Sequence, residues 1–303
     1  MTHDKTIRFF DMFSGIGGFR AGLERAGGFA CIGRCETDRR ADRAYQAAYD
    51  IKESEVFYED ARKIDAGGMP DFELLTGGFP CQSFSIAGKR KGFDDSRGAL
   101  FFEAARLAQE KRPPYLLLEN VPGLLSHDGG RTFAAILAAL NELGYIVEWA
   151  VLNSKDFGVP QSRRRVYIAG YLDPRCAGKI LPVGRTNPEA LKLIINGGHQ
   201  SSRVYDPSGL SRTLTSGNSP SGLYAVPADA GEGLRIRRLT PWECFRLQGF
   251  SEEQIDSLLS VDSDAQAYRQ AGNAVTVNVI HAIGDNIKAI HTELMAKGGI
   301  HHA

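Results

Sequence analysis

The sequence has few cysteines, and they form no disulfide pattern. Its 5 cysteines occur at spacings that match no disulfide framework, which is typical of proteins in a reducing cytosol. Cys31 and Cys35 are close enough in sequence to suggest a metal site. No companion Cys or His pair follows them nearby, so two thiols in the hydrophobic core are the favoured interpretation and no metal is expected.

The sequence also lacks a charge excess and a long apolar run. Lys plus Arg and Asp plus Glu number 36 each, so any nucleic-acid binding must come from local basic patches. The N-terminus has no apolar signal core, and the run AAILAAL at 134–140 is too short to span a bilayer. These absences predict a cytoplasmic protein with no membrane partner.

Strand-like and helical segments alternate through the first 172 residues. The helical segment after the first strand places Phe19, Leu23 and Ala26 on one face and ends at Gly27. Regular alternation of this kind predicts an α/β fold with a doubly wound, mostly parallel sheet. The expected strands span residues 7–13, 29–36, 72–76, 115–121, 145–152 and 165–172.

The composition changes after these segments. Residues 173–233 are rich in Gly, Pro, Ser and Asn, which predicts a smaller, irregular β-rich domain. A helix is expected after Thr240, because Thr240 and Glu243 can form a capping box. The apolar segment 274–297 predicts a closing helix that packs back on the first domain. We assign residues 1–175 and 265–303 to the first domain, and 176–264 to the second domain with its hinge.

Glycines follow the first predicted strand, in the segment DMFSGIGG. Gly15 and Gly17 would let a ligand approach the backbone, but Arg20 stands where a dinucleotide fingerprint requires its third glycine. Glu36 ends the second strand, where a carboxylate can bind ribose hydroxyls. A nucleoside-type ligand without a pyrophosphate fits these residues, and a plain glycine turn with surface acids is the alternative.

Reactive groups follow later strands at the same expected edge of the sheet. Cys81 comes after Pro80 at the head of a polar, basic loop, although free cysteines are usually buried. Glu119 follows three leucines, and burial there would raise its pKa toward that of a useful general acid. Arg163 and Arg165 flank the start of the next strand. One edge therefore collects a thiol, a carboxyl group and guanidinium groups.

Seven segments resemble the motifs of bacterial DNA (cytosine-5) methyltransferases, most closely those of the HhaI type. In the family's order they are FFDMFSGIGGFR, CETD, TGGFPCQSFSIAGKRKGFDDSRGALFF, LLLENVPGL, VPQSRRRVYIAG, RRLTPWECFRLQGF and YRQAGNAVTVNVI. The resemblance implies a Rossmann-like methyltransferase sheet with a target-recognition domain. It also implies S-adenosyl-L-methionine as cofactor and a cytosine flipped out of double-stranded DNA as substrate. A monomer is implied, acting in a restriction–modification system or as an orphan or phage enzyme.

The resemblance further implies covalent catalysis. Cys81 would add as a thiolate to C6 of cytosine, Glu119 would hydrogen-bond to N3 or protonate it, and C5 would then attack the cofactor methyl group. Thiolates are strong nucleophiles at a modest pKa, which neighbouring guanidinium groups lower further. Arg165 matches the residue that contacts the base near O2, and Arg163 matches its supporting partner.

The other matched positions fall into two groups. Those expected to bind the cofactor are Phe13, Gly15, Gly17, Glu36, Thr37, Asp60, Pro80, Leu100, Asn273 and Val275. Those expected to bind DNA are Gln82, Ser85, Lys89, Arg97, Gln200, Arg203 and Thr213. The basic loop after Cys81 is expected to be a DNA-facing lid, with a solvated charged face as the alternative. Gln200 would fill the space left by the flipped base, and Arg203 would read a guanine or hold a phosphate.

Two departures and two rival functions stay open. Thr37 stands where the HhaI type has an aromatic residue, and Ala87 where it has a serine. An RNA cytosine-5 methyltransferase of the same fold is one rival, although such enzymes carry Cys-Phe-Thr where this chain has Cys244, Phe245 and Arg246. A catalytically silent DNA-binding homologue is the other rival, and the intact catalytic positions argue against it.

Overall fold

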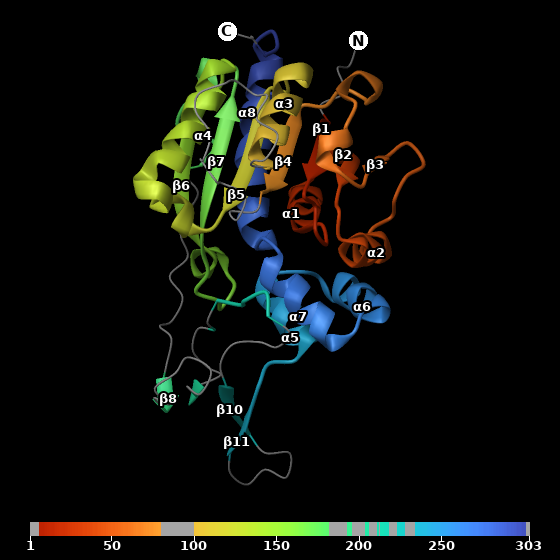
Figure 1. Cartoon of the computed structure of the whole chain (residues 1–303), viewed down its shortest axis with the longest axis vertical. Helices are drawn as coiled ribbons and strands as arrows, with labels where there is room; N and C mark the ends of the chain where they lie inside the picture. The colour runs from red at the N-terminus through yellow and green to blue at the C-terminus, as the bar shows by residue number, and fades with distance from the viewer. Residues whose placement is uncertain are drawn as a thin grey trace.

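The computed structural model describes residues 6–79, 100–181, 193–195, 204–205, 211, 213–217, 223–227 and 234–300. A seven-stranded sheet with the order β3-β2-β1-β4-β5-β7-β6 forms its centre (Figure 1). The strands are β1 Ile7–Met12, β2 Phe29–Cys35, β3 Val56–Tyr58, β4 Leu74–Gly78, β5 Tyr115–Asn120, β6 Ile146–Asn153 and β7 Arg164–Tyr171. The pairs among β1 to β5 are parallel, and β7 runs antiparallel to both of its neighbours. The predicted doubly wound, mostly parallel sheet is confirmed.

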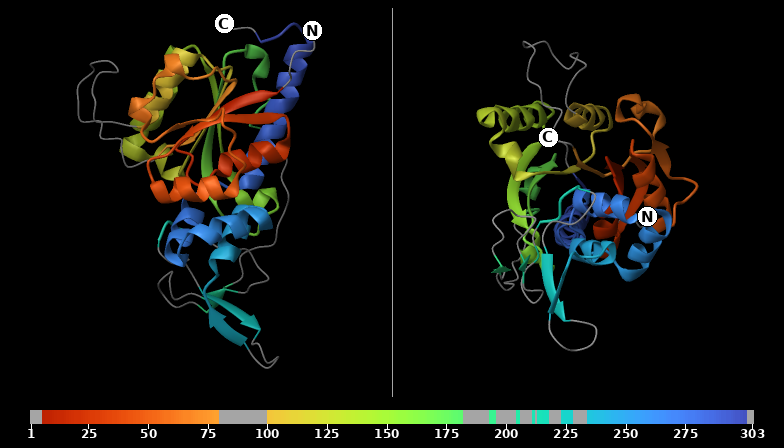
Figure 2. Two further views of the ribbon diagram at one scale, coloured as in Figure 1. Left: turned by 90° about the vertical axis from the view of Figure 1, so that its right-hand side faces the viewer. Right: turned by 60° about the horizontal axis from the view of Figure 1, so that its bottom comes forward.

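Helices cover both faces of this sheet (Figures 1 and 2). One face packs against α3 (Leu100–Lys111) and α4 (Arg131–Glu142), and the other against α1 (Gly18–Ala26) and α8 (Val277–Ala296). The predicted apolar face of α1 is buried, and α1 ends at Gly27, which has a φ of 70°. The predicted closing helix is α8, which lies so close to α1 that a Cβ at Gly22 would be 2.5 Å from Ile280.

A third group of helices lies beyond one end of the sheet (Figure 1). It comprises α5 (Pro241–Gln248), α6 (Glu252–Val261) and α7 (Asp264–Asn273), which share a hydrophobic cluster with α2 (Arg39–Ala48). The predicted capping box of Thr240 and Glu243 is present at the start of α5. Single turns of 3-10 helix lie at Ala61–Lys63, Ala66–Gly68, Pro122–Leu125, His127–Gly130, Ser154–Phe157 and Pro174–Cys176.

The predicted smaller β-rich part contains a second sheet. Its strands are β8 Leu193–Ile195, β9 Val204–Tyr205, β10 Leu223–Pro227 and β11 Leu234–Arg237, in the order β11-β10-β9-β8. Its segment 213–217 reaches α7, where a Cβ at Gly272 would be 2.2 Å from the carbonyl oxygen of Thr215. The domain boundaries expected after residues 175 and 264 stay a prediction.

The two neighbouring thiols of β2 lie in separate cores. Cys31 packs with α1 and α8, and Cys35 packs on the opposite face with α3 and α4. The structure therefore supports their interpretation as core thiols. Within the described ranges, no three His, Cys, Asp or Glu side chains are grouped so that they could hold a metal ion. None of the helices described here is both long and apolar enough to cross a membrane.

Candidate active site

A cavity of about 600 Å³ lies at the carboxyl ends of β1, β2, β4 and β5. The strand order reverses between β1 and β4, and open α/β sheets bind ligands at such a switch point. The loop after β1 lines one end of the cavity. The other end is lined by the ends of β4 and β5 and by the start of β7. Residues 213–216 and the end of α7 complete it.

The loop after β1 is held in an unusual backbone conformation. Phe13, Gly15 and Gly17 all have positive φ, at 55°, 54° and 82°. A non-glycine residue rarely adopts this region, so Phe13 is a strained position of the kind that gathers at functional sites. The Glu36 carboxylate accepts the backbone N–H of Gly15 at 2.7 Å and that of Asp38 at 2.8 Å. Burial raises the pKa of Glu36, and these donors oppose the rise.

The structure brings most of the sequence-predicted cofactor residues to this cavity. Thr37 stands exposed at its rim, Leu100 begins α3 beside it, and Asn273 and Val275 line the side next to α7. Gly17 belongs to the loop 13–18 but is not itself among the residues that line the cavity. Pro80 lies outside the described residues.

Asp60 is placed differently from the other predicted cofactor residues. It borders an adjoining hollow of about 380 Å³, which shares Thr37 with the main cavity. Arg62 donates to its carboxylate at 2.8 and 2.9 Å, and this hydrogen bonding lowers the pKa of Asp60. Its carboxylate therefore holds the turn after β3 as well as facing the smaller hollow.

Glu119 occupies the reactive end of the cavity. Its side chain is only 11% exposed, and its Oε1 lies 3.0 Å from Nε of Arg165. Burial raises the pKa of Glu119, as its position after three leucines predicts, and the guanidinium groups of Arg165 and Arg163 oppose the rise. Gly78 gives the carboxyl group room, because a Cβ there would be 3.3 Å from Oε2 of Glu119.

Arg163 supports the wall of the cavity from within. It is 1% exposed, and its guanidinium group donates to the carbonyl oxygens of Leu214, Gly272 and Ala274 at 3.0, 2.8 and 2.8 Å. It therefore ties segment 213–217, which lies between β9 and β10, to the end of α7. This arrangement fits the supporting role that the resemblance implied.

Asn120 is a site residue to which the sequence reasoning gave no role. Its Nδ2 donates to the carbonyl oxygen of Phe79 at 2.7 Å, and its Oδ1 accepts the N–H of Val121. Phe79 is 3% exposed and is followed in the sequence by Pro80 and Cys81. The only available signal was an amide beside the acid at the end of a buried strand.

Several predicted residues lie outside the described part of the chain. They are Cys81, Gln82, Ser85, Lys89, Arg97, Gln200 and Arg203. Of the predicted DNA-binding residues, Thr213 is described; it lines the cavity and its hydroxyl group donates to the carbonyl oxygen of Ser162. Cys244 is buried in α5, away from the cavity lining, and burial raises its pKa to about 12.

Comparisons with known proteins agree with this geometry. The family model described as C-5 cytosine-specific DNA methylase matches residues 7–183 and 181–289. The chain is 39% identical to the Type II methyltransferase M.SsoII of Shigella sonnei over 92% of this chain and 79% of that protein. It is 34% identical to the Type II methyltransferase M.HhaI of Haemophilus parahaemolyticus over 93% of this chain and 94% of that protein.

A solved structure shows the same fold. A DNMT2 mutant from Spodoptera frugiperda aligns with a TM-score of 0.70 at 18% identity, covering 91% of this chain and 98% of that one. At this identity the likeness concerns the architecture alone. The family match spans most of the sheet, the cavity and the closing helix, and the relatives are matched over nearly the whole chain. The chain therefore belongs to the C-5 cytosine-specific DNA methylase family.

Proposed function

We propose that the cavity brings S-adenosyl-L-methionine and a flipped-out cytosine of duplex DNA together, with Cys81 as the nucleophile. One observation carries this proposal. The same cavity holds the positive-φ loop braced by Glu36 and the buried pair of Glu119 and Arg165. Phe79 lines this cavity, and Cys81 follows it two positions later in the sequence.

The cofactor end suits a nucleoside with a compact, charged tail. The positive φ at Gly15 lets a ligand approach the backbone, and Glu36 presents a fixed carboxylate that can accept ribose hydroxyls. Phe13 adds an aromatic side chain to the lining. When bound, the cofactor supplies an electrophilic methyl group. Phe13, Glu36 and the end of α7 at Asn273 would hold it.

The reactive end suits covalent activation of cytosine. The Cys81 thiolate adds to C6, and Glu119 donates a proton or hydrogen bond to N3, so that electron density accumulates at C5. C5 would then take the methyl group that the bound cofactor supplies. Solvent water would accept the C5 proton as the Cys81 thiolate leaves, and the N3 proton would return to Glu119, which restores the ring. Burial favours the protonated form of Glu119 that this step requires. Arg165 fixes the carboxyl group, and the resemblance assigns it a contact with the base near O2.

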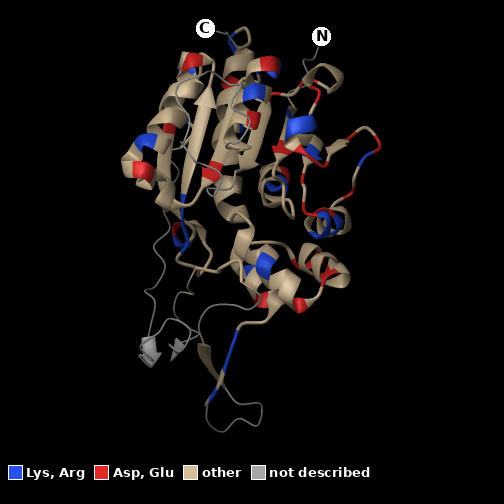
Figure 3. Cartoon of the chain, viewed as in Figure 1, with Lys and Arg blue, Asp and Glu red and all other residues tan. Residues whose placement is uncertain are grey.

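The second sheet is proposed to read DNA. Residues 176–264 would form the recognition domain with its hinge, and residues 1–175 with 265–303 the catalytic domain. Lys and Arg colouring follows β11 in Figure 3, so a local basic strand lies in this part despite the balanced total charge. Gln82, Ser85, Lys89, Arg97, Gln200, Arg203 and Thr213 are the proposed DNA contacts.

The proposed biological setting follows the relatives. The named relatives are Type II methyltransferases, which supports a role as the modification enzyme of a restriction–modification system. We propose that the chain acts in the cytoplasm as a monomer on double-stranded DNA. The tRNA alternative is weaker, because Arg246 stands where the Cys-Phe-Thr segment of such enzymes has threonine, and the buried Cys244 is not among the residues that line the cavity.

Methyl transfer from labelled cofactor to duplex DNA and to tRNA tests this function. Cys81→Ala should abolish transfer to DNA while retaining DNA and cofactor binding. Glu119→Gln should slow transfer by about 100- to 10,000-fold, the usual contribution of general acid–base catalysis.

A duplex with 5-fluorocytosine should trap the wild type covalently and not the Cys81→Ala protein. Cys244→Ala is the matched control and should remain active.

Near-normal transfer by Cys81→Ala would refute the covalent mechanism. Transfer to tRNA but not to DNA would instead support the RNA enzyme. Absence of transfer to both, with DNA binding intact, would support a silent homologue.

A further inference from the structure

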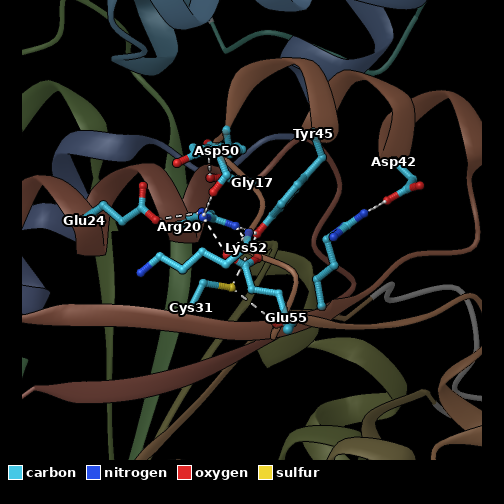
Figure 4. A network of polar contacts seen from close by, with 12 residues as sticks. Gly17, Arg20, Glu24, Cys31, Asp42, Tyr45, Asp50, Lys52 and Glu55 are labelled. Atoms are coloured by element: carbon cyan, nitrogen blue, oxygen red, sulfur yellow. Dashed lines mark hydrogen bonds and ion pairs between the residues drawn. The ribbon is translucent and has the colours of Figure 1, made fainter.

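Arg20 is a buried arginine on α1, directly behind the cofactor loop. It is 3% exposed and lies at the centre of the polar contacts in Figure 4. Its Nε donates to Oε1 of Glu24 at 2.7 Å, and its Nη1 donates to Oε2 of Glu55 at 2.7 Å. Its Nη2 donates to the carbonyl oxygen of Asp50 at 3.2 Å. The residue that breaks the dinucleotide fingerprint therefore joins α1 to the segment between α2 and β3.

Two tyrosines at the end of α2 stack against this guanidinium group. The Cζ of Arg20 lies 4.9 Å from the ring centroid of Tyr49 and 5.6 Å from that of Tyr45. The two ring centroids are 4.8 Å apart, and both side chains are buried. Cation–π contacts of this kind strengthen when they are desolvated. The ring of Tyr49 is therefore held in place by charge and by packing.

The two tyrosine hydroxyl groups point to different partners. The Tyr49 hydroxyl donates to the carbonyl oxygen of Gly17 at 2.6 Å. The Tyr45 hydroxyl lies 3.4 Å from Nη1 of Arg20 and 3.7 Å from Sγ of Cys31, away from the cofactor loop. Of these two hydroxyl groups, the one on Tyr49 contacts the loop backbone.

Gly17 is the residue through which Tyr49 reaches the loop. It precedes α1 with a φ of 82° and offers the helix no side-chain cap. Its backbone approaches the tyrosine ring closely, since a Cβ there would be 2.4 Å from Cε2 of Tyr49. The carbonyl group of Gly17 also accepts the N–H of Ala21, so it is fixed at the first turn of α1.

We propose that Tyr49 is a positioning residue for cofactor binding, which fixes the Gly17 peptide and with it the loop 13–18. This inference rests on the proposed function, in which that loop lines the cofactor site. Glu36 holds the loop on the cavity side through the N–H of Gly15, and Tyr49 holds it from behind. A loop ordered in advance loses less conformational entropy when a ligand binds, so its affinity is higher.

Tyr49→Phe tests the proposal because it removes the hydroxyl group and keeps the ring stacked on Arg20. The probe is S-adenosyl-L-homocysteine, with binding measured by calorimetry on the full chain. The net value of one hydrogen bond corresponds to a rise in Kd of about fivefold. The KM for S-adenosyl-L-methionine should rise in parallel, while kcat at saturating cofactor and the KM for DNA stay unchanged.

Tyr45→Phe is the matched control, since Tyr45 lies in α2, four residues before Tyr49, and the substitution removes a buried hydroxyl group from the same arginine stack. It should leave the Kd within about twofold of wild type, whatever it does to the melting temperature. Equal Kd values for the two variants, or a fall in melting temperature at Tyr49→Phe with no change in Kd, would overturn the inference.

Glu36→Ala separates this inference from the proposed function. If Glu36→Ala weakens binding and Tyr49→Phe does not, the positioning role is wrong and the cofactor site stands. If neither variant changes the Kd of S-adenosyl-L-homocysteine, the cofactor site is misplaced and the proposed function fails with it.

Discussion

Asn120 offers a direct test of how the cavity wall controls the reacting cysteine. Its side-chain amide donates to the carbonyl oxygen of Phe79, the last residue described before Pro80 and Cys81. Asn120→Ala deletes this bond and the acceptor of the Val121 N–H. Because Phe79 is buried, its carbonyl group would lose its side-chain donor without gaining free access to water.

The size of the effect follows from the loss of this one hydrogen bond, whose net contribution is about 0.5–1.5 kcal/mol. If the loss falls on the conformation that presents Cys81 to the base, the rate falls by about 2- to 13-fold. If the loss falls on folding alone, the melting temperature drops and the rate at saturating substrates does not change.

Single-turnover methyl transfer, with cofactor and duplex DNA both saturating, measures the effect on the rate directly. Formation of the 5-fluorocytosine adduct isolates attack by Cys81 and should slow by the same factor. Asn278→Ala is the control, because Asn278 donates to the carbonyl oxygen of Phe157 at 2.9 Å and does not line the cavity. A rate for Asn120→Ala within twofold of wild type would refute the reasoning.

Two further substitutions test buried features around the site. Burial raises the pKa of Asp11 to about 7, above an unfolded value near 3.9. Ionisation of Asp11 therefore lowers the free energy of unfolding. This loss of stability is complete above pH 7 and fades as the pH falls from 7 to about 3.9. Asp11→Asn should therefore raise the free energy of unfolding by up to roughly 4 kcal/mol at pH 8 and by little at pH 4, and an equal gain in urea titrations at both pH values would contradict this. Gly272→Ala would place a Cβ 2.2 Å from the Thr215 carbonyl oxygen, so it should displace segment 213–217 and raise the KM for DNA. Gly123→Ala, whose Cβ would meet its nearest atom at 4.0 Å, should leave that KM unchanged, and equal KM values for the two variants would exclude the displacement.

Six strands of the main sheet were predictable because each is a short apolar run between polar or glycine-rich turns, whereas β3, with three residues, was not among the expected strands. β5 was expected at 115–121 and spans Tyr115–Asn120, and β1 was expected at 7–13 and spans Ile7–Met12. The antiparallel direction of β7 could not be predicted in the same way. Strand direction depends on the path of the connecting chain, which the local apolar pattern does not encode.

The site was predictable where a residue acts through its own chemistry and unpredictable where it acts through distant partners. Glu119 stood out as an acid after three leucines, and its burial followed. The role of Arg20 did not follow, because Glu55 is 35 positions away and the contact depends on how α2 packs. The acceptors of Arg163 lie 51 to 111 positions away and are backbone carbonyls, which no residue pattern marks.

The packing of α8 on α1 has a consequence for the order of events during synthesis. The strands of the main sheet are complete at Tyr171, yet the side of α1 that meets α8, at Gly22, Leu23 and Ala26, stays uncovered until residues 277–296 are made. The end of α7, which lines the cavity, is also made late. A nascent chain that has already made β1 to β7 would thus hold the acid and the glycine loop without a closed site. Such a chain lacks the part of the cavity wall that residues 213–216 and the end of α7 supply, and it presents apolar surface of the kind that chaperones recognise.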